Sequence, residues 1–96
     1  MTKINSDVLA PIIRKHYEWL TTSPMAVRSD NPLHPGIGAV FMSLIEYGDA
    51  TGVRLDPNED DMLGYAKAAS KTVAEFYPQM TAMDWEEIIL REAPTI

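Results

Sequence analysis

The sequence predicts an all-α fold, a compact bundle of four main helices, and three observations favour it. Apolar residues recur at helical spacing in four separate segments. Residues typical of helix starts precede these segments, and glycine or proline follows several of them. The candidate extended stretch, residues 53–55, is too short to build a sheet. With 96 residues and 46% apolar side chains, we expect residues 1–96 to form a single α-helical domain around one core.

The first helix is expected at about residues 7–22, with Ser6 as its N-cap. Pro11 lies inside this range and is expected to bend the first turn or to delay the start of regular helix. We expect His16 to be a partly buried, hydrogen-bonded packing residue, because it falls on the apolar face. That face consists of residues three and four positions apart, namely Leu9, Ile12, Ile13, His16, Tyr17 and Leu20.

A long connection, residues 23–35, links the first two helices. Ser23 followed by proline predicts one short helical turn at about 24–27. Connections longer than about 12 residues are uncommon in compact domains and often carry function. We therefore single out Arg28 and His34 in this loop as candidate binding residues. The alternative interpretation is a proline-stiffened crossover between the helices.

The most regular amphipathic pattern predicts a second helix at about residues 36–47, with Gly48 as its left-handed stop. The two glycines at its start, Gly36 and Gly38, do not complete a dinucleotide or phosphate-binding motif. They are expected to allow a tight entry into the helix, although free amides there could hold a small anion. The apolar stripe comprises Ile37, Val40, Phe41, Leu44 and Ile45, while Met42 and Tyr47 lie off it.

The acidic segment "LDPNEDDMLGYA" predicts the start of a third helix, at about residues 57–77. Asp56 and Glu59 have the spacing of a capping box, with a proline at the first helical position between them. Asp60 and Asp61 follow in the first turn, where the helix dipole favours each acid by about 0.3–1 kcal/mol. The acidity of this segment therefore has a local structural reason, which is most complete for Asp56 and Glu59.

A fourth helix is expected at about residues 82–92. Thr81 and Asp84 form a second capping box at its start. Its apolar face contains Trp85, Ile88 and Ile89, with Met83 as a further candidate.

Composition excludes several classes of function. Residues 1–48 contain four basic and four acidic side chains, whereas residues 49–96 contain four basic and ten acidic ones, so the second half holds the entire net charge of −6. A field of this sign repels phosphate, so direct nucleic-acid binding is disfavoured and a basic protein is the expected partner. No apolar run approaches the roughly 20 residues of a membrane span, and no secretory leader is evident, so we expect a cytoplasmic protein without membrane contact. The chain has no cysteine, which excludes disulfides and thiolate chemistry.

No motif predicts a catalytic, cofactor or metal site. The twelve residues from Asp49 lack the glycine and the bidentate glutamate of a calcium-binding EF-hand loop. The sequence also lacks a nucleophile motif and the spacing of a transition-metal site. Glu46, Glu75 and Glu92 could still meet in space as an acid–base pair, an alternative that the sequence leaves open.

Two features favour a binding role. Glycine inside a helix costs about 1 kcal/mol relative to alanine, and Gly64 in the third helix therefore predicts the close approach of another helix, either internal or from a partner. Protein interfaces favour tyrosine, tryptophan and methionine. The sequence contains more of these residues than the predicted apolar faces of the helices account for.

The sequence thus predicts a small non-enzymatic binding protein, a regulator, inhibitor or accessory subunit, that acts through an acidic and aromatic surface. A homodimer is a further expectation. One alternative is an acidic nucleic-acid mimic that blocks a DNA- or RNA-binding protein, and another is a ligand-binding or enzymatic domain that uses the loop at 23–35. The candidate partner-binding residues are Trp19, Arg28, His34, Tyr47, Asp56, Glu59, Asp60, Asp61, Tyr65, Glu86 and Glu87.

Overall fold

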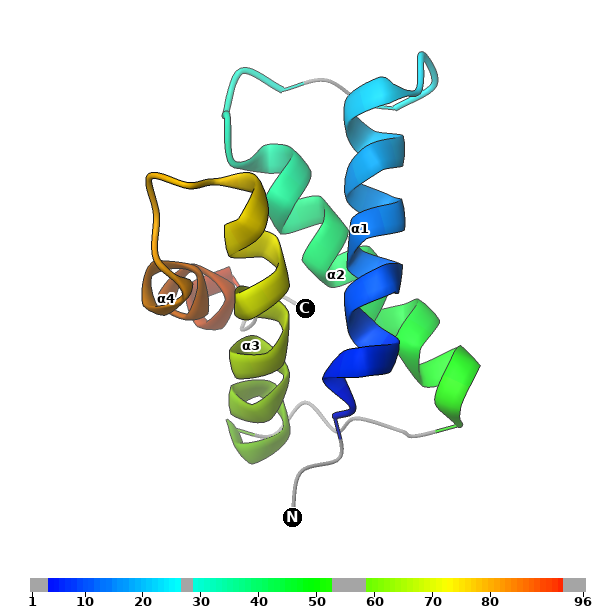
Figure 1. Ribbon diagram of the computed structural model, residues 1–96, viewed down its shortest axis with the longest axis vertical. Helices are drawn as coiled ribbons and strands as arrows, with labels where there is room; N and C mark the ends of the chain where they lie inside the picture. The colour runs from blue at the N-terminus through cyan, green and yellow to red at the C-terminus, as the bar shows by residue number, and fades with distance from the viewer. Residues whose placement is uncertain (1–3, 27–28, 53–58, 93–96) are drawn as a thin grey trace.

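The computed structural model describes residues 4–26, 29–52 and 59–92, without the side chains of residues 59 and 60. Within these ranges all regular structure is helical, which confirms the predicted all-α class (Figure 1). The elements in chain order are α1 (Ser6–Thr22), α2 (His34–Thr51), α3 (Glu59–Val73), the short 3-10 helix η1 (Ala74–Phe76) and α4 (Ala82–Glu92).

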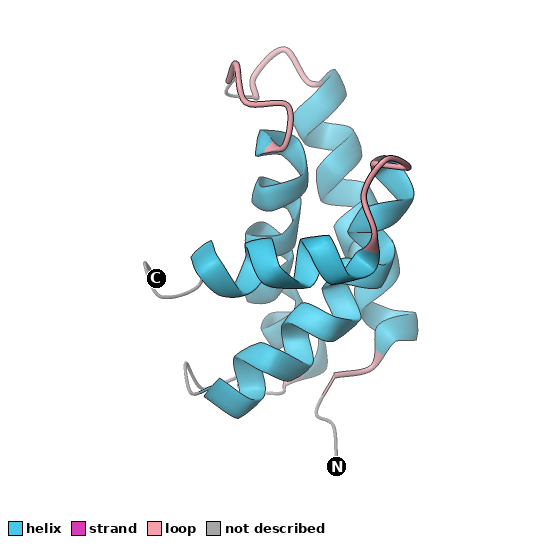
Figure 2. Cartoon of the chain, turned by 90° about the vertical axis from the view of Figure 1, so that its left-hand side faces the viewer, coloured by secondary structure: helices cyan, strands magenta, loops and turns pink. Residues whose placement is uncertain are grey.

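The helices form two packed pairs, α1 with α2 and α3 with α4, and α1 also packs against α3. Helix α1 crosses in front of α2 and runs in the opposite direction, with α3 on its other side (Figure 1). Helix α4 lies across α3, as the turned view shows (Figure 2). Helix α2 therefore packs mainly on α1, and the part of α2 nearer its C-terminus extends past α1.

The start of α1 differs from the prediction by one residue. Asn5, not Ser6, is the N-cap, because its side-chain oxygen accepts a hydrogen bond of 3.0 Å from the Asp7 amide. Both residue types are good caps, so composition alone does not choose between neighbours. Pro11 lies inside α1 without delaying its start. It is exposed, as is Asp7, so water can bind the Asp7 carbonyl that loses its helical donor.

Helix α2 is longer than predicted at both ends. It begins at His34, which is therefore the first helical residue rather than a loop residue. It ends at Thr51 rather than at residue 47, so the prediction of Gly48 as the stop is wrong. Gly52 takes the left-handed conformation, with φ of 71°, and its amide donates to the Gly48 carbonyl at 2.9 Å. Two glycines four positions apart can each end a helix, and the second one does so here.

The other predicted helix ends have mixed outcomes. Thr81 and Asp84 form the predicted capping box, with amide-to-side-chain distances of 2.9 and 3.1 Å. Helix α3 gives way to η1 after Val73 instead of continuing to residue 77. In the first connection, the Ala26 amide bonds the Ser23 carbonyl at 3.2 Å, which makes a single turn.

Other predictions lie outside the described residues. The start of the third helix and the Asp56 end of its capping box belong to this group, as does residue 27.

Aromatic residues fill much of the core. Trp85, Tyr47 and Tyr65 are the largest side chains with less than 2% exposure. Tyr17 stacks on Phe76 with ring centroids 4.0 Å apart, which joins α1 to η1. The core thus depends on a few large rings that reach between helices, which suits a short chain with few leucines.

Candidate protein-binding surface

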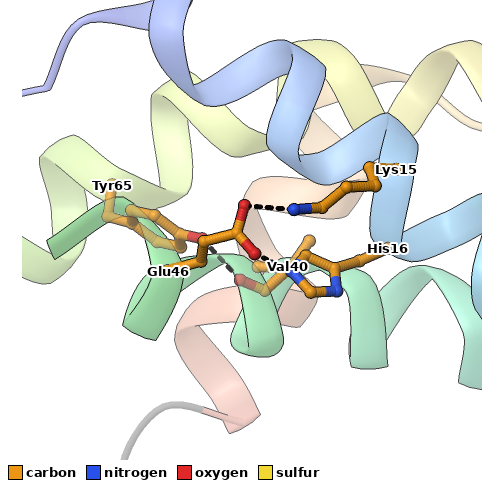
Figure 3. A network of polar contacts seen from close by, with 5 residues as sticks. All are labelled: Lys15, His16, Val40, Glu46 and Tyr65. Atoms are coloured by element: carbon orange, nitrogen blue, oxygen red, sulfur yellow. Dashed lines mark hydrogen bonds and ion pairs between the residues drawn. The ribbon is translucent and has the colours of Figure 1, made fainter. Parts of the chain in front are cut away.

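The polar contacts between helices show which charged side chains serve the fold. Glu46 of α2 is bound by two residues of α1: Lys15 donates to Oε2 at 2.5 Å, and His16 Nε2 lies 3.1 Å from Oε1 (Figure 3). The ammonium of Lys15, with a smaller contribution from His16, lowers the pKa of Glu46 below its ordinary value of 4.5. His16 is thus the partly buried, hydrogen-bonded residue that its position predicted, with its side chain 16% exposed.

A second ion pair ties α1 to η1. Arg14 donates from Nη2 to both carboxylate oxygens of Glu75, at 3.0 and 3.2 Å. Glu46 and Glu75 are therefore held by different bases of α1. They do not meet each other, so the acid–base pair that the sequence left open does not form between them.

The start of α2 does not present free amides to an anion. The Gly36 amide donates to the hydroxyl of Tyr77 at 3.2 Å, and that hydroxyl donates to the Pro32 carbonyl at 2.9 Å. The Ile37 amide donates to the Leu33 carbonyl. Partial burial, with a smaller contribution from Tyr17, raises the pKa of Tyr77 to about 12, so the phenol keeps its proton at neutral pH. The anion site considered for this helix start is therefore excluded at Gly36 and Ile37.

Two predicted surface residues are core residues instead. Tyr47 is 1% exposed, and its hydroxyl accepts a 2.7 Å hydrogen bond from the Asn5 amide. Tyr65 is fully buried, and its hydroxyl donates to the Val40 carbonyl (Figure 3). Burial raises the pKa of Tyr65 far above its ordinary value of 10.0. The expectation that these two tyrosines are exposed is wrong, because each hydroxyl finds a backbone partner inside the bundle.

The remaining predicted site residues are dispersed. Trp19 on α1 is 45% exposed, while His34 and Asp61 are partly buried at the starts of α2 and α3. Arg28 and Asp56 lie outside the described residues, as do the side chains of Glu59 and Asp60. Of the acidic residues at the start of α3, only the side chain of Asp61 lies within the described part of the chain.

Helix α4 presents an outward face that combines acidic and apolar side chains. Trp85, Ile88 and Ile89 point into the core. Met83 is 79% exposed, so the prediction that it could join the apolar face is wrong. Glu87 is exposed beside it, and Glu86 and Leu90 are partly exposed. We call Met83, Glu86, Glu87 and Leu90 the α4 surface, since residues three and four apart share one side of a helix.

Helix α2 presents an outward face of a different kind. Ile45 is 71% exposed, although the sequence pattern assigned it to the core. Met42, which lies off the predicted stripe, is 37% exposed. The ion pair of Lys15 and Glu46 lies at one edge of the contact between α1 and α2. Trp19 follows Lys15 by one helical turn, and Met42 precedes Glu46 by one turn. Because α1 and α2 run in opposite directions, Trp19 and Met42 lie on the same side of this ion pair, along the same edge.

Gly64 does not mark a helix contact within the described part of the chain. A Cβ atom built on it would meet no atom within 4 Å in the described part of the chain. Of the two alternatives for Gly64, an internal or a partner helix, the internal one therefore finds no contact among the described residues.

Comparisons with known proteins found no protein similar to this chain. No family model matches the chain, and neither the curated proteins nor the solved structures gave a match. Across residues 4–26, 29–52 and 59–92, no helix has the length and apolar character that spanning a bilayer requires. In the same ranges, no three histidine or acidic side chains are grouped so that they could hold a metal ion.

Proposed function

We propose that this chain is a small binding protein whose α4 surface docks on a basic patch of another protein, as a regulator, inhibitor or accessory subunit. The observation that carries the proposal is the exposure of Met83 at 79%, next to Glu87 on the outer side of α4. A methionine that exposed contributes no packing to the fold, whereas methionine is common in the contacts between proteins.

Charge supports a basic partner for this surface. Helix α4 contains Asp84, Glu86, Glu87 and Glu92 against one base, Arg91. Asp84 serves the capping box, and Glu86 and Glu87 have no ion pair within the described chain. Carboxylates at the rim of an interface speed association with a positive patch, and an apolar side chain between them supplies the contact that excludes water.

The nucleic-acid mimic remains an alternative with less support. It requires a continuous row of carboxylates at phosphate-like spacing. Glu75 is paired with Arg14, and Asp84 is hydrogen-bonded to the Thr81 amide, so both have structural roles. Imitation of a nucleic acid would also give no role to the exposed side chain of Met83, because phosphates have no apolar group.

The test compares proteins captured from the native lysate by the immobilised chain and by Met83→Ser/Glu86→Gln/Glu87→Gln. We expect the wild type to retain a basic protein that the variant retains at least about tenfold more weakly, which corresponds to 1.4 kcal/mol. Raising salt from about 0.05 to 0.5 M should weaken retention as well, because it screens the carboxylates.

The matched control is Glu18→Gln/Asp30→Asn. It removes the same number of charges from exposed positions on α1 and in the first connection. Equal retention by the wild type, the α4 variant and this control would exclude the α4 surface. Displacement of the captured protein by duplex DNA would favour the nucleic-acid mimic.

A further inference from the structure

The outward side of α2 carries a row of residues with the spacing of a helix-pairing seam. Gly38, Phe41, Ile45 and Gly48 follow each other at intervals of three, four and three positions. These are the a and d intervals at which two α-helices pack along each other. The buried residues of α2 lie on the other side of the helix: Gly36, Ala39, Val40, Ser43 and Tyr47. We call Gly38, Phe41, Ile45 and Gly48 the α2 seam, in which Ile45 is exposed and the other three residues are partly buried.

Contacts within the chain account for only part of the α2 seam. Ile45 at its centre is 71% exposed, and Phe41 is partly exposed beside it. Gly48 does not end the helix, since Gly52 has that role. A glycine in a helix interior allows another backbone to approach closely. Gly38 already has a close neighbour within the chain, the side chain of Leu20 in α1, because a Cβ on Gly38 would lie 3.0 Å from Leu20 Cδ1.

Charge distinguishes this face from the α4 surface. Helix α2 contains no lysine, arginine, aspartate or glutamate before Glu46, and Lys15 of α1 neutralises that carboxylate. Two copies of a chain with a net charge of −6 repel each other wherever acidic faces meet. Asp49, one turn after Ile45, is the other carboxylate of α2 and is exposed. If the two helices run in opposite directions, the two Asp49 side chains lie at opposite ends of the contact, so two copies can meet along the α2 seam without bringing these carboxylates together. Two copies that met through the α4 surface would instead bring Glu86 and Glu87 of one copy against those of the other.

The order of sizes along the seam fits a second copy in the opposite direction. From Gly38 to Gly48 the order is small, large, large, small, which is the same when it is reversed. An antiparallel two-fold pair would set Phe41 against the partner's Ile45 twice, and Gly38 against the partner's Gly48 at each end. Such an isologous contact is the commonest form of homodimer, and the opposed helix dipoles also favour it.

We propose that two copies of this chain form an antiparallel dimer through the α2 seam, with Trp19 and Met42 at the edge of the contact. A helix of 18 residues is about 27 Å long. One helix pair with flanking side chains covers less than the roughly 800 Å² per partner of a standard interface, so the dimer has a Kd in the micromolar range. This contact is independent of the α4 surface, so either proposal can fail alone.

The test is sedimentation equilibrium of the full chain at concentrations from about 1 to 300 μM. The wild type should change from the monomer mass to twice that mass, whereas Ile45→Glu should remain monomeric because it places a carboxylate in each central layer. Ile45→Ser adds no charge and should weaken the dimer at least about tenfold. Met83→Ser, on the α4 surface, should dimerise like the wild type. Circular dichroism confirms that each variant keeps its helices.

Cross-linking tests the direction of the helices. Pairing Phe41 with the partner's Ile45 puts the two-fold axis next to position 43, so Met42 of both copies meets at one edge. Met42→Cys should give an intermolecular product with a short thiol-to-thiol cross-linker, and the chain has no other cysteine to confuse the result. Met83→Cys, at a more exposed position on α4, should not. A monomeric wild type, a dimer unaffected by Ile45→Glu, or equal cross-linking of both cysteine variants would overturn the proposal.

Discussion

Gly36 of α2 lies directly against the indole of Trp85 in α4. A Cβ atom at position 36 would stand 2.6 Å from Cη2 of Trp85 and 2.8 Å from Cε2 of Tyr77. Trp85 is fully buried, and its ring lies 5.0 Å from that of Tyr77. The absence of a side chain at this one position therefore permits the contact between the start of α2 and α4.

Gly36→Ala tests this relationship. The added methyl group must displace two packed rings, and overpacking of this kind costs about 1–3 kcal/mol. We expect the free energy of unfolding, measured by urea denaturation, to fall by that amount.

Gly64→Ala is the matched control, since a Cβ at position 64 of α3 would meet no described atom within 4 Å. Alanine is the better helix former by about 1 kcal/mol, so this variant should be more stable than the wild type. Similar stability changes in the two variants would show that Gly36 is not sterically required.

The contrast between these glycines shows where sequence reasoning reaches its limit. The capping box of Thr81 and Asp84 is local, because both partners lie within one turn, and the sequence predicted it correctly. The role of Gly36 depends on Trp85, 49 positions further along the chain, so no local pattern reveals it. Sequence spacing could predict that position 36 begins a helix, but not what lies against it.

The candidate site shows the same limit. Ile45 fits the apolar stripe of α2, yet it lies outside, because α1 and Tyr65 occupy the side that contains Val40 and Tyr47. Because apolar residues lie on most sides of α2, the sequence pattern does not determine which side faces the core. The acidic character of α4 was visible in the sequence, whereas the exposure of Met83 was not.

Tyr65→Phe tests the hydrogen bond that links α3 to α2. The phenol of Tyr65 donates to the carbonyl of Val40, which also accepts a backbone bond inside α2. Because that carbonyl keeps its helical partner, the loss is that of one buried hydrogen bond, about 1 kcal/mol. Urea denaturation should show this decrease at neutral pH with little change in the helical circular dichroism signal. A loss above about 3 kcal/mol would mean that the ring repacks as well.

Ser43→Ala is expected to stabilise the protein. The hydroxyl of Ser43 is fully buried in α2 and has no hydrogen-bond partner among the described residues. An unsatisfied buried polar group costs about 1–3 kcal/mol, and alanine also has the higher helix propensity. The variant should therefore gain about 1 kcal/mol in free energy of unfolding. Ser70→Ala is the control, because its hydroxyl donates to the Lys67 carbonyl at 3.0 Å and its removal deletes a bond. A more stable Ser70→Ala than Ser43→Ala would contradict this account.

Glu46→Gln should remove a pH-dependent part of the stability. Glu46 has a pKa below its ordinary value of 4.5 in the folded chain, chiefly because Lys15 donates to it. A group with a lowered folded-state pKa stabilises the protein above the unfolded-state value, and this stabilisation is lost as pH falls through the folded-state value. The wild type should therefore be more stable than Glu46→Gln at neutral pH, and the difference should shrink below about pH 4.5.

Thermal unfolding of both proteins between about pH 3 and 7 measures this difference. Glu75→Gln is the control, since Glu75 is held by Arg14 and is 51% exposed, whereas Glu46 is bound by both Lys15 and His16 and is 34% exposed. It should alter the melting temperature less than Glu46→Gln does at neutral pH. A difference between wild type and Glu46→Gln that stays constant over the whole range would mean that the shape of the side chain, rather than its charge, holds α2 against Lys15 and His16.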